Sequence, residues 1–146
     1  PILVDGTYGT FIHVGHNMVK DGRLGFLNRI ILTPSHHRVH HARNPLYIDT
    51  NYCNLLNIWD KVFGTFQDEK NDIQIEYGIT RKINSGNFLD VYFGDITTLI
   101  KDVFYAPGLI NKFKYIFMPP GWNHTGDHKT AKLIRSNYLS AEKVLR

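Results

Sequence analysis

The sequence predicts a mainly α-helical fold, and three stretches of the chain carry this prediction. Residues 34–43 have helix-start and helix-stop signals at their two ends. Apolar residues recur at helical spacing within residues 51–63, and again over about 17 residues from Phe88 to Phe104. Residues 73–77 alternate apolar and polar side chains, which indicates one short extended segment. We therefore expect helices joined by loops.

Length and composition limit the chain to one domain at most. Its 146 residues are 42% hydrophobic and 13% aromatic, which is enough for a core. No unbroken apolar stretch of about 18 residues is present, so no complete membrane span is visible. The first ten residues lack the basic start and the cleavage pattern of a signal peptide. On these grounds alone the chain is expected to be soluble.

The net charge limits which kinds of molecule the chain is expected to bind, and the cysteine content indicates its redox compartment. A net charge of +4 fits a cytoplasmic surface beside anionic lipid, or an ordinary solvated surface. Nucleic-acid binding is disfavoured, because no basic patch with interleaved aromatic residues is present. The single cysteine, Cys53, excludes an internal disulfide and suits a reducing compartment. Its apolar neighbours predict a buried, small hydrophobic side chain.

The most unusual stretch is residues 33–45, where four of the eight histidines fall within six residues. Thr33 is a candidate N-cap, and Pro34 suits the first helical position because its missing N–H costs nothing there. Asn44-Pro45 is expected to end the helix, since a residue before proline avoids the α region. Residues three and four apart share a helix face. The face predicted from this spacing holds three histidines: His37, His40 and His41.

Three imidazoles on one face can bind a metal ion, and imidazole suits zinc, copper, iron and nickel. His36 lies above His40 on the predicted helix but is turned away from His37. The alternative is a solvated, histidine-rich helical turn. Arg38 and Arg43 count against metal binding unless they point away from the histidine face, because positive charges beside a cation are unfavourable.

The motif extends well beyond the histidines. Residues 33–66 read TPSHHRVHHARNPLYIDTNYCNLLNIWDKVFGTF, followed by Tyr77-Gly78-Ile79-Thr80 and Pro120-Gly121-Trp122. This pattern resembles the last histidine box of the fatty acid hydroxylase and sterol desaturase superfamily. Within it, the chain looks most like the alkylglycerol monooxygenase branch. The resemblance covers most of the chain from about His13 to Trp122.

The resemblance implies a membrane-embedded, non-haem di-iron oxygenase with its histidine boxes on the cytoplasmic side. Two iron ions activate O2, and a C–H bond of a lipid substrate is hydroxylated or desaturated. The reductant is tetrahydrobiopterin in the most similar branch, and an external electron carrier in others. Only the last box and a candidate for the preceding one are present here, so the chain is expected to be a C-terminal fragment with an incomplete di-iron site. Cys53 also departs from the pattern, since relatives carry a small residue there.

Carried over to this sequence, the resemblance makes His37, His40 and His41 metal ligands, and His36 a further ligand or a supporting residue. His16 is the preferred candidate from the preceding box, ahead of His13. A histidine bound to metal usually donates its other N–H to a carboxylate or carbonyl. The residues expected to give such support are Asp60, Asp49 and Asn51. The alternatives are that Asp60 pairs with Lys61 or Arg43, and that Asp49 or Asn51 is only a helix cap.

The other elements carry weaker predictions. Residues 24–32 are expected to be helical, and Gly64 is expected to end the helix over residues 51–63. The helix from Phe88 is either an interfacial lid at the entrance for an acyl chain or ordinary core packing. A glycine loop between His124 and His128 argues against their binding metal. We expect a family domain over residues 1–122 and a polar, basic tail over residues 123–146, which is partly helical from Lys129 to Arg146.

Three functions remain open from the sequence. The first is a lipid monooxygenase fragment, as the resemblance implies. The second is a non-catalytic domain whose histidines bind zinc or nickel. The third is an inactive relative kept for lipid or partner contacts. Further histidine boxes between long apolar spans in the upstream coding sequence would favour the first.

Overall fold

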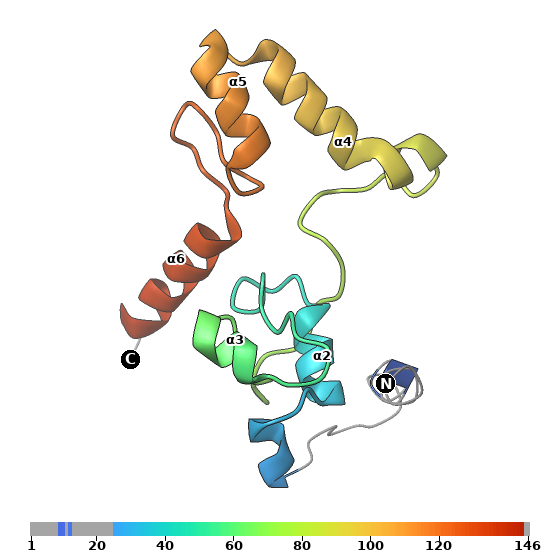
Figure 1. Cartoon of the computed structure of the whole chain (residues 1–146), viewed down its shortest axis with the longest axis vertical. Coiled ribbons are helices and arrows are strands. Elements are labelled where there is room, and N and C mark those ends of the chain that lie inside the picture. The colour runs from blue at the N-terminus through green and yellow to red at the C-terminus, as the bar shows by residue number, and fades with distance from the viewer. Residues whose placement is uncertain (1–8, 11, 13–24, 145–146) are drawn as a thin grey trace. The chain divides into compact units, whose positions relative to one another are not determined.

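The computed structural model describes residues 9, 10, 12 and 25–144, and these are mainly helical, with no strand among them. The chain divides into two compact units, residues 1–79 and residues 80–146. The first unit contains the 3-10 helix η1 (Gly25–Arg29) and two short helices, α2 (Pro34–His40) and α3 (Ile58–Phe63). The second contains α4 (Phe88–Tyr105), α5 (Gly108–Phe117) and α6 (Ala131–Val144) (Figure 1). The family-domain boundary expected at residue 122 stays a prediction.

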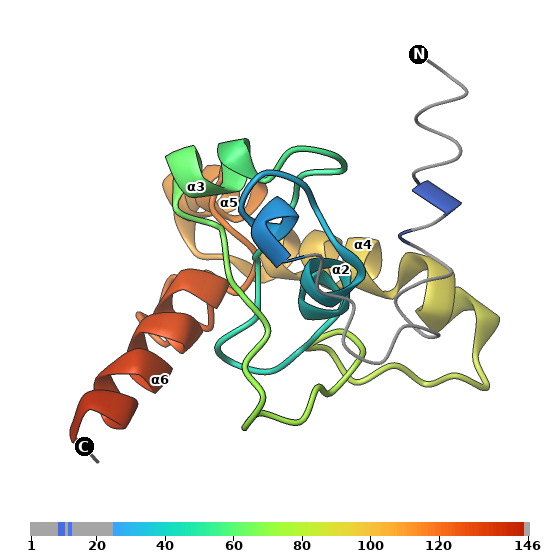
Figure 2. The ribbon, with the colours of Figure 1, turned by 90° about the horizontal axis from the view of Figure 1, so that it is seen from below.

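In the first unit, loops enclose the short helix α2, as the view in Figure 2 shows. Six of the seven residues of α2 are buried, and only His40 at its end is exposed. The buried apolar residues described in this unit are Ile12, Leu32, Val39, Ala42, Leu46 and Tyr47. Two isolated antiparallel bridges hold the loops, one from Ile31 to Leu56 and one from Ala42 to Tyr77. A helix of this length is marginal alone, so its surroundings stabilise it.

The histidine helix begins where the sequence predicts and ends earlier. Thr33 is its N-cap, with a capping box, and Pro34 is its first residue. The helix ends at His40, so the prediction that it runs to Asn44 was wrong. The physical reason is competition from a distant segment: Arg43 N–H donates to the Glu76 carbonyl at 2.7 Å, and Gly78 N–H donates to the His41 carbonyl at 3.3 Å. These bonds pull the chain out of helical geometry directly after the third histidine.

The predicted helix over residues 51–63 is also shorter, because it starts at Ile58. Asn51 has a left-handed backbone with φ +53°. The Asp60 carboxylate accepts hydrogen bonds from the N–H groups of Tyr52 and Cys53. The Leu55 carbonyl accepts a hydrogen bond from Leu32 N–H at 2.8 Å. Backbone N–H and carbonyl groups of residues 51–57 therefore form hydrogen bonds with other segments and not within a helix. Residues 24–32 likewise form only the 3-10 helix η1 within their described part.

Gly64 ends α3 in the left-handed conformation, with φ +73°, as predicted. A Cβ added at Gly64 would meet no atom within 4 Å, so an alanine there has only its backbone strain to overcome. Gly64→Ala is expected to lower the free energy of unfolding by about 1–2 kcal/mol, the cost of a left-handed L-residue. Urea unfolding measures this change. Gly86→Ala is the control, because Gly86 does not have a positive φ and its Cβ contact is ordinary. Equal stabilities of the two variants would contradict the account.

The second unit follows the sequence prediction closely. Asn87 caps α4, since its side-chain oxygen accepts from Leu89 N–H at 2.9 Å and from Asp90 N–H at 3.3 Å. Pro107-Gly108 separates α4 from α5, and these two helices pack against each other (Figure 1). Gly121 is required in the turn that follows, because a Cβ there would clash with the Lys129 carbonyl oxygen. The predicted partly helical tail is confirmed as α6.

Apolar side chains on α4 and α5 are largely exposed in this structure. Gly94 is the one buried residue of α4 in the described chain, and α5 contains none. The alternative of ordinary core packing for α4 is therefore not what the described residues show. None of the helices within residues 25–144 combines the length and the apolar character needed to cross a membrane.

Candidate metal centre

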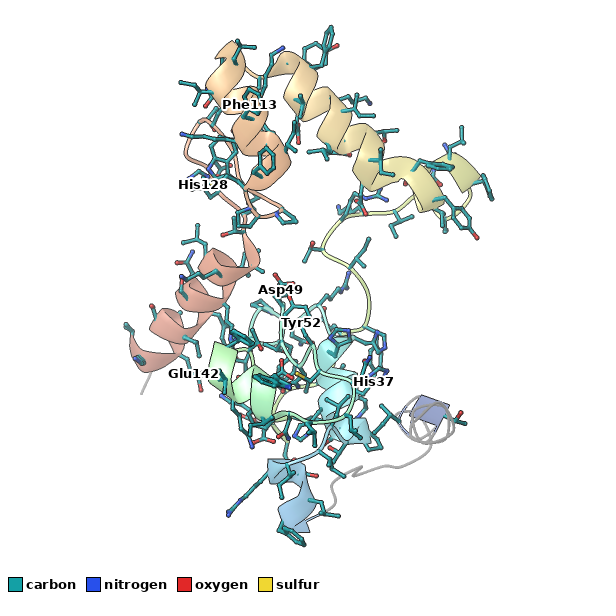
Figure 3. All side chains as sticks on the ribbon, viewed as in Figure 1. His37, Asp49, Tyr52, Phe113, His128 and Glu142 are labelled. Atoms are coloured by element: carbon teal, nitrogen blue, oxygen red, sulfur yellow. The ribbon has the colours of Figure 1, made fainter. Side chains whose placement is uncertain are left out.

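The end of α2 brings three histidine rings together. The ring centroids of His37 and His41 are 4.5 Å apart, those of His40 and His41 are 5.3 Å apart, and those of His37 and His40 are 5.9 Å apart. His37 is buried, whereas His40 and His41 are exposed. Figure 3 shows His37 projecting from α2. The prediction that these three histidines share one face is confirmed by the ring distances.

Two of these rings lie at the spacing of a chelating pair. The Nε2 atoms of His37 and His41 are 3.0 Å apart. Two imidazole nitrogens bound at right angles to one cation, each at about 2.1 Å, would be about 3.0 Å apart. Without a metal, one of the two rings donates a proton to the other across the same distance. The donor set therefore fits a cation that prefers imidazole nitrogen.

The third ring, His40, is oriented by the backbone. Its Nδ1 lies 3.1 Å from the carbonyl oxygen of Thr50, which can only accept a hydrogen bond. The proton of a neutral His40 therefore sits on Nδ1, and Nε2 presents its lone pair. This Nδ1–H to carbonyl bond is the usual way in which a metal-binding imidazole is held. Among the described residues, no group of three or more His, Cys, Asp or Glu side chains is arranged to hold a metal ion by itself.

His36 occupies a different position from the other three. Thr33 N–H donates to its Nδ1 at 3.3 Å, so the ring proton lies on Nε2, which donates to Asp68 at 3.0 Å. The side chain is fully buried and meets the Phe66 ring edge-on at 5.1 Å. Burial lowers the pKa of His36, although Asp68 acts in the opposite direction. With both ring nitrogens engaged, His36 is placed to support α2 and not to bind metal alongside His37.

The predicted supporting residue Asn51 acts on the backbone of the histidine helix. Its side-chain amide donates to the His36 carbonyl at 3.1 Å and to the Gln67 carbonyl at 2.7 Å. Its side-chain oxygen accepts from Gln67 N–H at 2.9 Å. Asn51 thus fastens residue 67 to α2 from a fully buried position. The alternative reading, a helix cap, does not describe it, because α3 starts at Ile58.

Asp60 is buried, and its carboxylate holds the loop before α3 through hydrogen bonds. Its carboxylate accepts from Tyr52 N–H at 2.9 Å, from Cys53 N–H at 3.1 Å and from the Thr65 hydroxyl at 2.6 Å. These partners are neither a histidine nor the Lys61 and Arg43 side chains considered above. Burial by itself would raise the pKa of Asp60, but the hydrogen bonds from Thr65, Cys53 and Tyr52 outweigh it and lower that pKa. Asp60 therefore supports the site by fixing the loop that carries Tyr52.

Asp49 and Tyr52 form a pair beside the histidines, and Figure 3 labels both. Burial, together with a hydrogen bond from the Tyr52 hydroxyl to the Asp49 carboxylate, raises the pKa of Tyr52 to about 12. The Tyr52 ring meets the His40 ring edge-on at 6.0 Å. Sequence reasoning used Tyr52 only as part of a motif. Its place next to a histidine could not be read from spacing, because the loop between them is irregular.

The two arginines that argued against metal binding are neutralised by acidic partners. Arg38 donates to Glu69 from Nη2 at 2.7 Å and from Nε at 3.1 Å, and both side chains are largely shielded. Arg43 Nε lies 3.3 Å from Glu76. A guanidinium paired in this way contributes little net charge to a nearby cation site. The objection raised from the sequence therefore carries less weight.

A pocket of about 450 Å³ opens beside the exposed histidines. His40 and His41 line one part of it, and Tyr77, Gly78 and Ile79 line the rest. The backbone bridge between Ala42 and Tyr77 positions this segment against the end of α2. The lining is mostly apolar, so the pocket suits a hydrocarbon group next to two imidazoles. The sequence signal for these residues was the Tyr77-Gly78-Ile79-Thr80 motif.

The remaining candidate histidines lie either outside the described residues or in the second unit. His16 and His13 lie outside the described residues. His124 Nδ1 is 2.9 Å from the Tyr115 hydroxyl, and His128 Nδ1 accepts from Asn123 N–H at 3.1 Å. Each of these two histidines therefore has its own hydrogen-bond partner within the second unit.

Comparison with known proteins identifies the family to which the histidine segment is related. Residues 2–65, which include the whole histidine cluster, match the fatty acid hydroxylase family. This segment belongs to the fatty acid hydroxylase family. No solved structure matches it.

The curated relatives of this chain include enzymes named for lipid oxidation. It is similar to alkylglycerol monooxygenase from Homo sapiens, with 46% identity over 99 residues, or 68% of this chain and 22% of the relative. The Caenorhabditis elegans alkylglycerol monooxygenase is 39% identical over 121 residues, or 77% of this chain and 24% of the relative. Ornithine lipid hydroxylase from Rhizobium tropici is 36% identical over 81 residues, or 56% of this chain and 24% of the relative. The chain thus spans about a quarter of the length of these relatives.

Proposed function

We propose that this chain is part of an integral-membrane lipid monooxygenase that uses O2 and histidine-bound iron to oxidise a C–H bond of a lipid. The observation that carries this proposal is the 3.0 Å separation of the His37 and His41 Nε2 atoms, with His40 beside them. Membership of the fatty acid hydroxylase family supports the reaction class. The names of the relatives support a lipid substrate.

In this proposal His37, His40 and His41 bind iron as neutral imidazoles. His16 and histidines elsewhere in the full-length polypeptide complete a site for two irons, since this chain matches only about a quarter of its relatives. When bound, the iron would supply the activation of O2, with one oxygen atom entering the C–H bond of the substrate and the other leaving as water. The two electrons that this requires would come from tetrahydrobiopterin or from an external carrier.

The residues of this chain have three tasks in the reaction. Thr50 holds the His40 ring through its carbonyl, so that Nε2 faces the metal. Asn51, together with His36 and Asp68, anchors α2 and so fixes the position of the ligands. Tyr77 and Ile79 contact the hydrocarbon part of the lipid in the pocket beside His40 and His41. A substrate held there is aligned for attack at one carbon.

Metal removal from the full-length protein tests this proposal. Membranes that contain the full-length gene product are treated with a chelator and then resupplied with iron or zinc, and oxidation of an alkylglycerol and of an ornithine lipid is measured. Chelation is expected to abolish oxidation, and iron but not zinc is expected to restore it. Absence of iron from the active protein, or restoration by zinc, would overturn the proposal.

A second candidate, a zinc- or nickel-binding domain without catalysis, has the same histidine pair as its support. It predicts that the chain binds zinc tightly with no consumption of O2 by the full-length protein. The chelation experiment separates the two candidates, because only the monooxygenase needs iron for product formation.

A further inference from the structure

One face of α5 is exposed and strongly apolar. The five large apolar residues of this face are between 53% and 79% exposed: Leu109, Ile110, Phe113, Ile116 and Phe117. None of the residues of α5 is buried. Contiguous apolar surface of this kind marks a contact with another molecule or with a membrane. We call these five residues the apolar face of α5.

Two lysines border this face on its two sides. At about 100° per residue, the five apolar positions cover an arc of roughly 120°. Lys112 and Lys114 fall about 40° beyond the two edges of that arc. Lysines at the borders of an apolar helix face can place their stems along the face and their ammonium groups in a polar layer.

The opposite side of α5 packs within its own unit. The Asn111 side-chain amide donates to the Pro107 carbonyl at 2.9 Å. The Tyr115 hydroxyl lies 2.9 Å from His124, and its ring meets the Trp122 ring edge-on at 5.0 Å. The contacts of Tyr115 place this side of α5 against the loop that follows the helix, and the apolar face lies on the other side.

The neighbouring helix α4 adds exposed apolar surface of the same kind. Its large exposed residues include Phe88, Tyr92, Ile96 and Phe104. Two acidic residues of α4 are paired with Arg81, which contacts Asp90 at 2.8 Å and Asp95 at 2.7 Å. The positive charge of Arg81 therefore partly neutralises these two carboxylates.

The positive charge of the whole chain is concentrated in the second unit. Residues 80–146 contain ten Lys and Arg against five Asp and Glu, whereas residues 1–79 contain seven against eight. The unit with the exposed apolar helices is thus the basic one. Basic residues around an apolar helix face are the combination that binds anionic lipid surfaces.

We propose that α5 lies in the surface of an anionic lipid bilayer, with its apolar face in the acyl region and Lys112 and Lys114 among the phosphate groups. A second copy of this chain fits the face less well, because self-pairing would bring the bordering lysines of both copies together. The proposal does not depend on the metal site, since the histidines of α2 take no part in it.

Vesicle flotation with the 146-residue chain tests the proposal directly. The probes are vesicles of phosphatidylcholine alone and vesicles in which about a third of the lipid is phosphatidylserine. Tight binding to the anionic vesicles, and much weaker binding to the neutral ones, is expected. Equal binding to both would overturn the electrostatic part of the proposal, and failure to bind the anionic vesicles would overturn all of it.

Paired variants identify the surface that binds. Phe113→Ser with Phe117→Ser is expected to lower the affinity for anionic vesicles at least tenfold, because two aromatic side chains no longer enter the bilayer. The matched control replaces Phe26 and Phe63 by serine, since these are comparably exposed aromatics of the first unit. An equal loss in the control pair would overturn the assignment to α5. Circular dichroism verifies that each variant keeps its helices.

Charge variants test the bordering lysines. Lys112→Gln with Lys114→Gln is expected to weaken binding to anionic vesicles about thirtyfold, since each lysine near a lipid surface contributes about a factor of five. Lys132→Gln with Lys143→Gln removes the same charge from α6 and is expected to have a smaller effect. Equal losses would contradict a role of position, and a dimer whose formation requires Phe113 and Phe117 would favour a second copy as the occupant.

Discussion

Replacement of His37 or His41 by alanine is expected to lower lipid oxidation by the full-length protein at least a hundredfold and to reduce its iron content. The physical reason is the 3.0 Å spacing of their Nε2 atoms, which suits two ligands on one cation. Even a residue that only orients a metal ligand costs 10–100-fold in metal affinity or activity when changed, so loss of a ligand costs more. Iron per protein and product formation in membranes are the two measurements.

The matched control for these variants is His124→Ala. His124 is exposed, belongs to the second unit and contacts the Tyr115 hydroxyl, so its loss should leave iron content and oxidation near the wild-type level. His40→Ala is expected to behave like His37→Ala. Full iron content and activity in His37→Ala, or an equal loss in His124→Ala, would show that the α2 cluster does not hold the metal.

Asp60→Asn is expected to lower the free energy of unfolding of the first unit by about 3 kcal/mol. The buried carboxylate accepts three hydrogen bonds, from Tyr52 N–H, Cys53 N–H and the Thr65 hydroxyl. Bonds to a charged acceptor contribute about 1.5–3 kcal/mol, and an amide NH2 group would face donors where an acceptor is needed. Urea unfolding at neutral pH measures the loss.

The same residue gives a defined pH dependence. The pKa of Asp60 is lower in the folded chain than its ordinary value of 3.8, because its hydrogen bonds outweigh the effect of burial. Its contribution to stability is therefore fully present above pH 3.8 and is lost as the pH falls through the lower, folded-state pKa. The stability difference between the wild type and Asp60→Asn should shrink across that acid range and stay constant above it.

The control for the carboxylate is Asp127→Asn. Asp127 is exposed and lies 3.8 Å from Lys129, so its replacement should change stability by less than about 0.5 kcal/mol. A difference between wild type and Asp60→Asn that does not vary with pH would contradict the role of the charge. An equally destabilised Asp127→Asn would show that the effect is not specific to burial.

Local signals in the sequence predicted several elements correctly. Thr33-Pro34 predicted the start of the histidine helix, and Gly64 predicted the end of α3. The apolar spacing after Asn87 predicted α4 to within about one residue. These features depend on contacts within one or two helical turns, so the neighbouring residues contain the information needed to predict them.

Features that depend on distant segments were predicted wrongly or were missed. The histidine helix ends at His40 because residues 76–78 bind the backbone of His41 and Arg43. Residues 51–57 are not helical because their backbone groups form hydrogen bonds with the Asp60 carboxylate and with Leu32 N–H. His36 bonds to Asp68, 32 residues away along the chain, and no local pattern reveals such a partner.

The amino-acid sequence by itself determined that three histidines lie on one face, because helical spacing alone sets that arrangement, and its motifs identified the family. Only the tertiary structure decided which imidazole nitrogens face one another and which are already taken by protein partners. It also brought Tyr77 and Ile79 to the rim of the histidine cluster. The physical reason is that hydrogen bonds and bridges to segments outside the helix set these positions, from Thr50, 10 residues after His40, to Asp68, 32 residues after His36. Helix periodicity contains no information about such partners.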